Sequence, residues 1–184
     1  MYRVKEMFYS LQGEGARAGR AAVFCRFSKC NLWNGREDSR AQSVCQFCDT
    51  DIVGIDGQNG GEFSSARELA DQINTMWLEQ SESTNTKRSK PYIIFTGGEP
   101  LLQLDEALID QMHHDSFEVA IESNGTLPLP KGVDWVCLSP KSDSKIVFDK
   151  CDELKLFILR KKPFLSALKT FLQAIIFYPQ WPTH

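Results

Sequence analysis

Three cysteines, Cys30, Cys45 and Cys48, are spaced C-x14-C-x2-C along the chain. Three thiolates can bind three irons of a 4Fe-4S cluster and leave the fourth iron open to a second molecule, whereas a structural zinc site normally has four protein ligands. The spacing therefore favours an iron-sulfur centre that takes an additional ligand. A four-cysteine zinc site is the alternative, because Cys25 would extend the pattern to C-x4-C-x14-C-x2-C.

The expected strand over 21–28 predicts which way the side chains of Cys25 and Arg26 point. Successive side chains of a strand point to opposite faces, so Cys25 shares a face with apolar residues and is expected to pack in the core. Arg26 points the other way. A guanidinium in an apolar strand needs a partner, which could be a ligand carboxylate or a salt bridge to Glu14 or Glu122.

The apolar pattern predicts strands that alternate with helices. Six strands are expected, over residues 3–10, 21–28, 92–96, 117–123, 133–138 and 154–159. Two amphipathic helices are expected as well, one after Ser65 and one over 101–112 with Asp105 in its early turns. Strands and helices in alternation predict an α/β fold with mostly parallel strands and functional loops at their carboxyl ends.

Composition narrows the class of protein. The 184 residues are 42% hydrophobic and carry a net charge of −3, so we expect one domain over 1–184 and a small-molecule ligand rather than nucleic acid. No stretch approaches the roughly 18 to 20 apolar residues of a membrane span, and the first ten residues are too polar for a signal peptide, so a cytoplasmic protein is expected. Cys137 and Cys151 are isolated and receive no role. Residues 54–61 and 81–90 are expected to form loops.

Five motifs in order carry a resemblance to a known family. The cysteines, with the aromatic Phe47 between the last two, precede Thr-Gly-Gly-Glu-Pro at 96–100, an arrangement similar to the radical S-adenosylmethionine (SAM) superfamily. The usual superfamily spacing is C-x3-C-x2-C, and the 14-residue interval departs from it. Four more segments extend the likeness: Tyr-Ser-Leu-Gln-Gly-Glu-Gly, Cys-Asp-Thr, Glu-Ser-Asn-Gly and Ser-Pro-Lys. Over about residues 1–158 the chain resembles the 7-carboxy-7-deazaguanine synthase family, including its members with an enlarged cysteine loop.

The resemblance implies a fold and a cofactor site. The fold would be an incomplete (β/α) barrel, and Cys30, Cys45 and Cys48 would bind the 4Fe-4S cluster, whose open iron chelates SAM so that an electron can cleave it to a 5'-deoxyadenosyl radical. Ten residues would bind SAM, namely Phe47, Cys48, Asp49, Gly97, Gly98, Glu99, Ser123, Ser139, Pro140 and Lys141. The two glycines would let the backbone approach the SAM amino group, and Glu99 would accept from it.

The resemblance also implies a substrate and partners. The substrate would be 6-carboxy-5,6,7,8-tetrahydropterin, converted by ring contraction with loss of ammonia to 7-carboxy-7-deazaguanine, an early step toward queuosine. The substrate would contact Leu11, Gln12, Gly13, Arg26 and Thr96, with Thr50 beside a magnesium ion. The partners would be a reductant such as flavodoxin or ferredoxin and a second copy of the chain. No protein acid, base or nucleophile is expected, because the cofactor supplies the difficult chemistry.

Strand alternation adds one substrate residue to those implied by the resemblance. Glu118, Ala120 and Glu122 share a face of their strand. Glu122 could accept hydrogen bonds from two adjacent N–H groups of the pterin, because a carboxylate matches that geometry.

Residues 160–184 depart from the family pattern. Pro163 could begin a helix with an apolar stripe, formed by Phe164, Leu168, Phe171, Leu172 and Ile175. Two other functions remain open: a radical SAM enzyme such as an activase that acts on another substrate, and a zinc-stabilised binding module in which Cys25 is the fourth ligand.

Overall fold

The computed structural model describes residues 1–83, 89–141, 144–148 and 150–156. The helix expected after Pro163 and the end of the last predicted strand lie outside these residues, as does part of the expected loop 81–90. Among the described helices, none has both the length and the apolar character that a bilayer-spanning helix needs.

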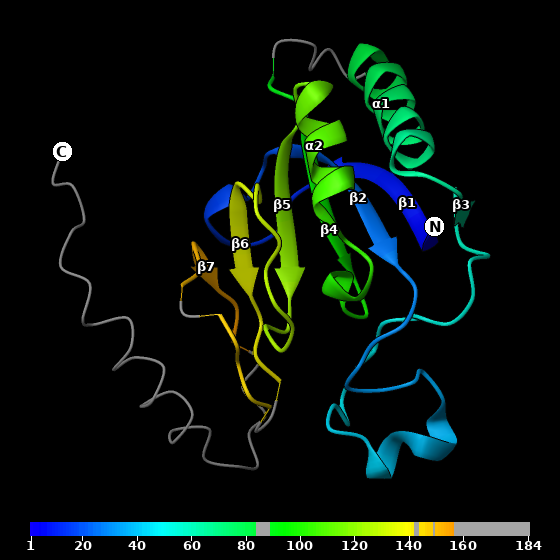
Figure 1. Ribbon diagram of the computed structural model, residues 1–184, viewed down its shortest axis with the longest axis vertical. Helices are drawn as coiled ribbons and strands as arrows, with labels where there is room; N and C mark the ends of the chain where they lie inside the picture. Colours follow the sequence, from blue (N-terminus) through cyan, green and yellow to red (C-terminus); the bar gives the residue numbers. More distant parts are fainter. Residues whose placement is uncertain (84–88, 142–143, 149, 157–184) are drawn as a thin grey trace, which may run out of the picture.

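The described strands form one seven-stranded sheet in the order β3-β1-β2-β4-β5-β6-β7 (Figure 1). The strands are β1 (Tyr2–Leu11), β2 (Ala21–Phe27), β3 (Gly61–Phe63), β4 (Tyr92–Gly97), β5 (Glu118–Ser123), β6 (Trp135–Leu138) and β7 (Glu153–Leu154). β1 is antiparallel to both of its neighbours, and every pairing from β2 to β7 is parallel. The sheet does not close on itself, so the predicted α/β fold, mostly parallel and incomplete as a barrel, is confirmed.

Two α-helices, α1 (Ala66–Ser83) and α2 (Glu106–His114), cover the same face of the sheet (Figure 1). Ser65 caps the start of α1: its Oγ accepts from the Glu68 N–H at 3.2 Å, and the Glu68 carboxylate accepts from the Ser64 N–H at 2.7 Å. The Trp77 ring of α1 packs at a tilt against Tyr9 and edge-to-face against Phe117, with ring centroids 5.5 and 5.9 Å away. The main core therefore lies between these helices and the sheet.

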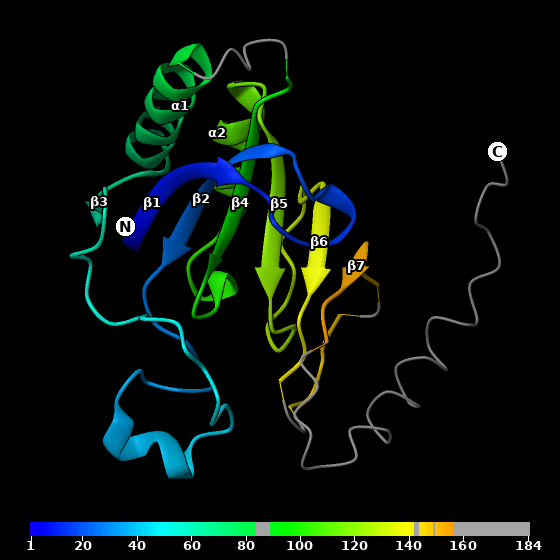
Figure 2. The same cartoon turned by 180° about the vertical axis from the view of Figure 1, so that it is seen from behind.

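Cys25 and Arg26 lie on opposite faces of β2, as alternation predicts. Cys25 is completely buried in the main core, which confirms its packing role. The face without α-helices carries a smaller apolar cluster around Tyr92, Ile94 and Ala120. The segment after β1, which contains the 3-10 helix η1 (Gly15–Arg17), crosses this second face (Figure 2).

The helix expected over 101–112 is interrupted. A short 3-10 helix, η3 (Pro100–Leu102), comes first, and α2 begins only after Asp105. Asp105 is the N-cap of α2, since its carboxylate accepts from the Leu108 N–H at 3.0 Å, and it therefore lies before the helix rather than within its first turn.

Three other strand and loop predictions need correction. The loop expected from residue 81 begins later, because α1 continues to Ser83. β3 begins at the last residue of the expected loop 54–61. It forms because it pairs with the start of β1. Of the strand expected over 154–159, Leu154 lies in β7, Lys155 and Leu156 are not in a strand, and 157–159 lie outside the described residues.

Candidate functional site

The site lies at the carboxyl ends of the parallel strands, where the loops after β2, β4, β5 and β6 meet (Figure 1). The Glu99 N–H donates to the Lys29 carbonyl at 3.1 Å, and the Ser139 N–H donates to the Ser123 carbonyl at 2.7 Å. These bonds connect the loops after neighbouring strands. Parallel strands thus bring motifs from distant parts of the sequence to one edge of the sheet.

The loop after β2 places the three predicted cluster ligands together. Cys45 is buried with Trp33 and Ile52, while Cys30 and Cys48 pack against this small cluster. A hydrogen bond between Cys45 and Cys48 lowers the pKa of the Cys48 thiol and raises that of Cys45. Burial raises the pKa of Cys30, although the Leu32 N–H donates to its sulfur at 3.4 Å.

The position of Cys25 decides whether four cysteines can share one metal ion. Among the described residues, no three His, Cys, Asp or Glu side chains converge on one point as the ligands of a single ion do. The cysteine ligands of a 4Fe-4S cluster each bind a different iron, so they need to surround a larger space. Cys25 lies in the main core rather than with the other three, so the four-cysteine zinc alternative is wrong.

Gly97 and Gly98 allow two backbone segments to approach each other closely. A Cβ on Gly97 would lie 2.4 Å from the Phe27 carbonyl oxygen, and Gly97 has φ +142°. A Cβ on Gly98 would lie 2.1 Å from the Lys29 carbonyl oxygen and 2.7 Å from Cys30 Cβ. The glycines are therefore needed where β4 meets the segment that leads to Cys30, in addition to any contact with a ligand.

Glu99 is fully buried and connects the ends of β4 and β5. Its Oε1 accepts from the Ser123 hydroxyl at 2.8 Å and from the Leu101 N–H at 3.0 Å, and its Oε2 accepts from the Asn124 N–H at 2.8 Å. Burial raises the pKa of Glu99, and these donors oppose the rise. The sequence did not indicate these partners for Glu99 and Ser123, for which we had predicted contacts with SAM.

Lys141 brings a cation toward the cysteines. Its ammonium donates to the Ser139 carbonyl oxygen at 2.9 Å, in a turn that also contains Pro140. Burial lowers the pKa of Lys141, whereas the nearby Cys45 and Cys48 act in the opposite direction. The Ser-Pro-Lys motif therefore lies on the same side of the sheet as the cysteine loop.

Comparison with known proteins decides the family. No protein-family model matches the chain. The 7-carboxy-7-deazaguanine synthase of Bordetella pertussis is 58% identical over 155 residues, which are 84% of this chain and 70% of that protein. The synthase of Burkholderia multivorans is 53% identical over 157 residues, 85% of this chain and 71% of its own. The chain belongs to the 7-carboxy-7-deazaguanine synthase family.

A solved structure shows the same fold for this synthase-family chain. The crystal structure of QueE from Escherichia coli superposes with a TM-score of 0.64 and covers 94% of this chain and 76% of that one. The two sequences are 23% identical, so the structural likeness supports the fold alone.

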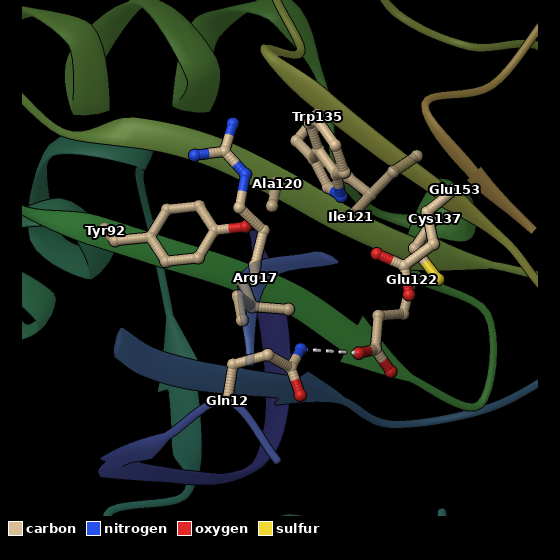
Figure 3. Close-up of a pocket in the computed structure, with 10 residues that line it drawn as sticks. Gln12, Arg17, Tyr92, Ala120, Ile121, Glu122, Trp135, Cys137 and Glu153 are labelled. Carbon is tan, nitrogen blue, oxygen red and sulfur yellow. Dashed lines mark hydrogen bonds between the residues drawn. The ribbon is translucent and has the colours of Figure 1, made fainter. Parts of the chain in front are cut away.

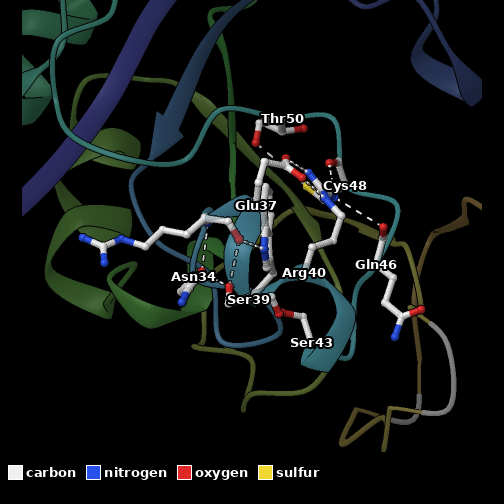
Figure 4. A network of polar contacts seen from close by, with 10 residues as sticks. Asn34, Glu37, Ser39, Arg40, Ser43, Gln46, Cys48 and Thr50 are labelled. Atoms are coloured by element: carbon white, nitrogen blue, oxygen red, sulfur yellow. Dashed lines mark hydrogen bonds and ion pairs between the residues drawn. The ribbon is translucent and has the colours of Figure 1, made fainter.

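Arg40 is a residue of the enlarged synthase loop that sequence reasoning missed (Figure 4). It lies in the 3-10 helix η2 (Glu37–Gln42), with its guanidinium carbon 4.1 Å from the centroid of the Trp33 ring. Its Nε donates to Glu37 Oε2 at 2.7 Å, and its Nη1 donates to the Cys48 carbonyl oxygen at 2.9 Å. Arg40 thereby connects the insertion to the last cysteine. The spacing of Glu37 and Arg40, three residues apart, was the available signal.

The remaining residues predicted around the cysteines occupy different positions. Phe47 packs with the Cys45 cluster, and Asp49 is exposed. The Cys48 thiol donates to the Thr50 carbonyl oxygen at 4.0 Å, and a further hydrogen bond from Thr50 lowers the pKa of that thiol. Thr50 therefore lies beside the predicted cluster ligand.

Two of the predicted substrate residues, Gln12 and Glu122, are in contact on the face without α-helices. Gln12 Nε2 donates to Glu122 Oε1 at 3.1 Å, across a pocket that Tyr92 and Trp135 also line (Figure 3). Leu11 and Gly13 are exposed beside Gln12. The face assignment of Glu122 is confirmed.

Arg26 pairs with a carboxylate of the neighbouring strand β1. Its Nε donates to Glu6 Oε1 at 2.8 Å, because Glu6 of β1 lies opposite Arg26 in the antiparallel register. The alternative salt bridge to Glu14 or Glu122 is therefore wrong. On the other side of β2, Thr96 lies opposite Arg26 in the parallel register and is 8% exposed.

Proposed function

We propose that this chain converts 6-carboxy-5,6,7,8-tetrahydropterin to 7-carboxy-7-deazaguanine, with loss of ammonia, as a radical SAM lyase of queuosine biosynthesis. The observation that carries the proposal is the convergence of Cys30, Cys45 and Cys48 with Gly98 and Lys141 at one edge of the sheet. The family membership supplies the reaction.

The cysteine side would hold the cofactors. A 4Fe-4S cluster with SAM supplies, when bound, the radical that abstracts a substrate hydrogen atom. Cys30, Cys45 and Cys48 would hold the cluster. We assign SAM to Phe47, Cys48, Asp49, Gly97, Gly98, Glu99, Ser123, Ser139, Pro140 and Lys141, with Ser123 acting through the buried Glu99. The Lys141 ammonium, which lies near Cys45 and Cys48, would balance the carboxylate of SAM through a charge-assisted hydrogen bond.

The face without α-helices would hold the pterin. Arg26 keeps guanidinium nitrogens beyond the one that Glu6 occupies, and these can bind a substrate carboxylate. Glu122 and Gln12 would contact the amino-pyrimidinone edge, with Leu11, Gly13 and Thr96 around the ring. Tight contacts on this apolar face would also exclude water from the radical.

We further propose a magnesium ion near the Thr50 hydroxyl. Mg²⁺ prefers a few oxygen ligands together with retained waters, so one threonine and the substrate carboxylate would suffice. A one-electron donor such as flavodoxin or ferredoxin and a homodimeric assembly complete the proposal by analogy with the family.

Anaerobic turnover tests the function. Reconstituted protein would be incubated with SAM, reductant, Mg²⁺ and the tetrahydropterin, while iron, sulfide and zinc are measured on the same sample. We expect an iron-sulfur cluster and a product with the mass of 7-carboxy-7-deazaguanine. SAM cleavage without that product would indicate a radical SAM enzyme with another substrate, and zinc without a cluster would overturn the enzyme assignment. Omitting Mg²⁺ tests the metal separately, with slower turnover expected.

A further inference from the structure

Lys155 is a residue near the substrate face to which neither the sequence motifs nor the family comparison gave a role. It directly follows β7, far along the chain from the segments it contacts. Its ammonium lies 2.9 Å from Glu14 Oε2 and 3.2 Å from Glu122 Oε1. One cation therefore connects the loop after β1, the end of β5 and the end of β7.

In the described part of the chain, the carboxylate of Glu122 accepts hydrogen bonds through Oε1. Gln12 Nε2 and the Lys155 ammonium both donate to Oε1, at 3.1 and 3.2 Å. Among the described residues, none donates to Oε2. Glu122 also lines a small pocket beside Tyr92 and Trp135, and the Arg17 guanidinium lies over both of these rings (Figure 3). The second oxygen is thus the one left for a ligand.

Lys155 offsets the negative charge of several carboxylates at this position. Glu14 and Glu122 are both within 3.2 Å of the ammonium, and Glu153 lines the same pocket. Burial alone would lower the pKa of Lys155, but the charge of Glu122 and the hydrogen bond to Glu14 outweigh it and raise that pKa. The side chain is therefore an ammonium at neutral pH, and it offsets carboxylates that would otherwise repel each other.

We propose that Lys155 is a positioning residue that fixes the orientation of the Glu122 carboxylate, with Oε2 presented to an N–H donor of the pterin. This inference rests on the proposed function. Lys155 acts through Glu122 rather than on the reacting atoms, so its loss weakens substrate binding and leaves the cysteine side unchanged.

A double-mutant cycle between Lys155 and Glu122 tests the proposal on the cluster-loaded enzyme. Lys155→Met should raise KM for the tetrahydropterin roughly tenfold or more, the effect of losing a hydrogen bond to a charged group, with a smaller change in kcat. Lys155→Arg should restore KM to within a few-fold of wild type. In the Glu122→Gln background, Lys155→Met should have little further effect, because the two residues act together. Lys131→Met, in the exposed loop before β6, is the matched control.

The outcomes separate the possible failures. If Lys155→Met raises KM by the same factor in the wild-type and Glu122→Gln backgrounds, or leaves the KM of the wild type unchanged, Lys155 does not act through Glu122. The proposed function would still stand. Absence of product from the wild type would instead overturn the proposed function. SAM cleavage without substrate and the melting temperature are measured for each variant, and a parallel fall of both would show a merely structural role. If Lys155→Met does not fold, Lys155→Gln takes its place in the cycle.

Discussion

The Ser123 hydroxyl donates to the buried carboxylate of Glu99 at 2.8 Å, and this bond connects the ends of two parallel strands behind the cysteine loop. The glutamate of the Thr-Gly-Gly-Glu-Pro motif is thereby fixed by the serine of the Glu-Ser-Asn-Gly motif. Two motifs that the sequence suggested as separate ligand contacts are thus one structural unit. The geometry on the ligand side depends on this buried bond.

Replacing Ser123 with alanine tests the strength of this unit. Ser123→Ala removes one of the two donors to Glu99 Oε1, and we expect the free energy of unfolding to fall by about 1–3 kcal/mol, the cost of leaving a buried acceptor under-satisfied. Urea titration measures it. Ser83→Ala, at the exposed end of α1, should change stability by no more than about 0.5 kcal/mol. Equal changes in the free energy of unfolding for the two substitutions would contradict the conclusion that Ser123 and Glu99 form one structural unit.

Of the four cysteines considered as metal ligands, Cys25 packs in the core, and Cys30, Cys45 and Cys48 are predicted to bind iron. Cys25→Ala leaves a small cavity in the main core, so we expect a loss of about 1–2 kcal/mol in stability and an unchanged iron content. Cys45→Ala should instead abolish the intact cluster. Iron and sulfide analysis with urea titration checks both, and loss of bound metal from Cys25→Ala would revive the zinc alternative.

Arg40 should determine how well the enlarged loop retains its cluster. Arg40→Leu removes the hydrogen bond to the Cys48 carbonyl and the contact with Trp33, so iron should bind about tenfold more weakly, as is typical when an outer partner of a ligand is lost. Competition with an iron chelator measures this. Arg36→Leu, at an exposed position of the same loop, serves as the control. Similar iron retention in both variants would show that Arg40 only covers the surface.

Glu118 should contribute stability that depends on pH. It lies 2.9 Å from both Arg17 Nη2 and Arg20 Nη2. Burial alone would raise its pKa, but Arg20 and Arg17 hold the pKa of this carboxyl below its ordinary value. A carboxylate with a lowered folded-state pKa stabilises the fold above its unfolded pKa and loses that contribution as the pH falls through the folded value.

The comparison is between wild type and Glu118→Gln. Their difference in unfolding free energy should be constant from about pH 6 to 8 and should shrink below about pH 4.5. Glu79→Gln, at an exposed position of α1, should show no comparable trend. A wild-type advantage that stays the same down to pH 3.5 would mean that the arginines do not act on Glu118 electrostatically.

Local pattern predicted most of the sheet and the face of each strand. Cys25 and Glu122 lie on the expected faces because alternation is a local property of extended chain. The start of α2 was missed, because Asp105 suits either an N-cap or a first helical turn and only the bond to the Leu108 N–H decides between them. β3 was missed because three residues form a strand only when a long partner is already present.

The site was predicted less completely where partners come from distant segments. Arg26 was expected to need an anion, but the identity of Glu6 depends on the antiparallel register of β1 and β2, which the sequence does not specify. Lys155 was missed for the same reason, since it meets Glu14 only after the sheet has assembled. Motif residues can be predicted from the sequence, whereas the residues that position them are identified only from the tertiary structure.

The most direct test of the central claim compares product formation by the wild type and by Cys45→Ser. Both proteins would be reconstituted under the same anaerobic conditions and given SAM, reductant, Mg²⁺ and 6-carboxy-5,6,7,8-tetrahydropterin, with 7-carboxy-7-deazaguanine measured by mass spectrometry. We predict product in repeated turnovers from the wild type and none from Cys45→Ser. A wild type with a complete 4Fe-4S cluster that cleaves SAM but yields no 7-carboxy-7-deazaguanine would contradict the account.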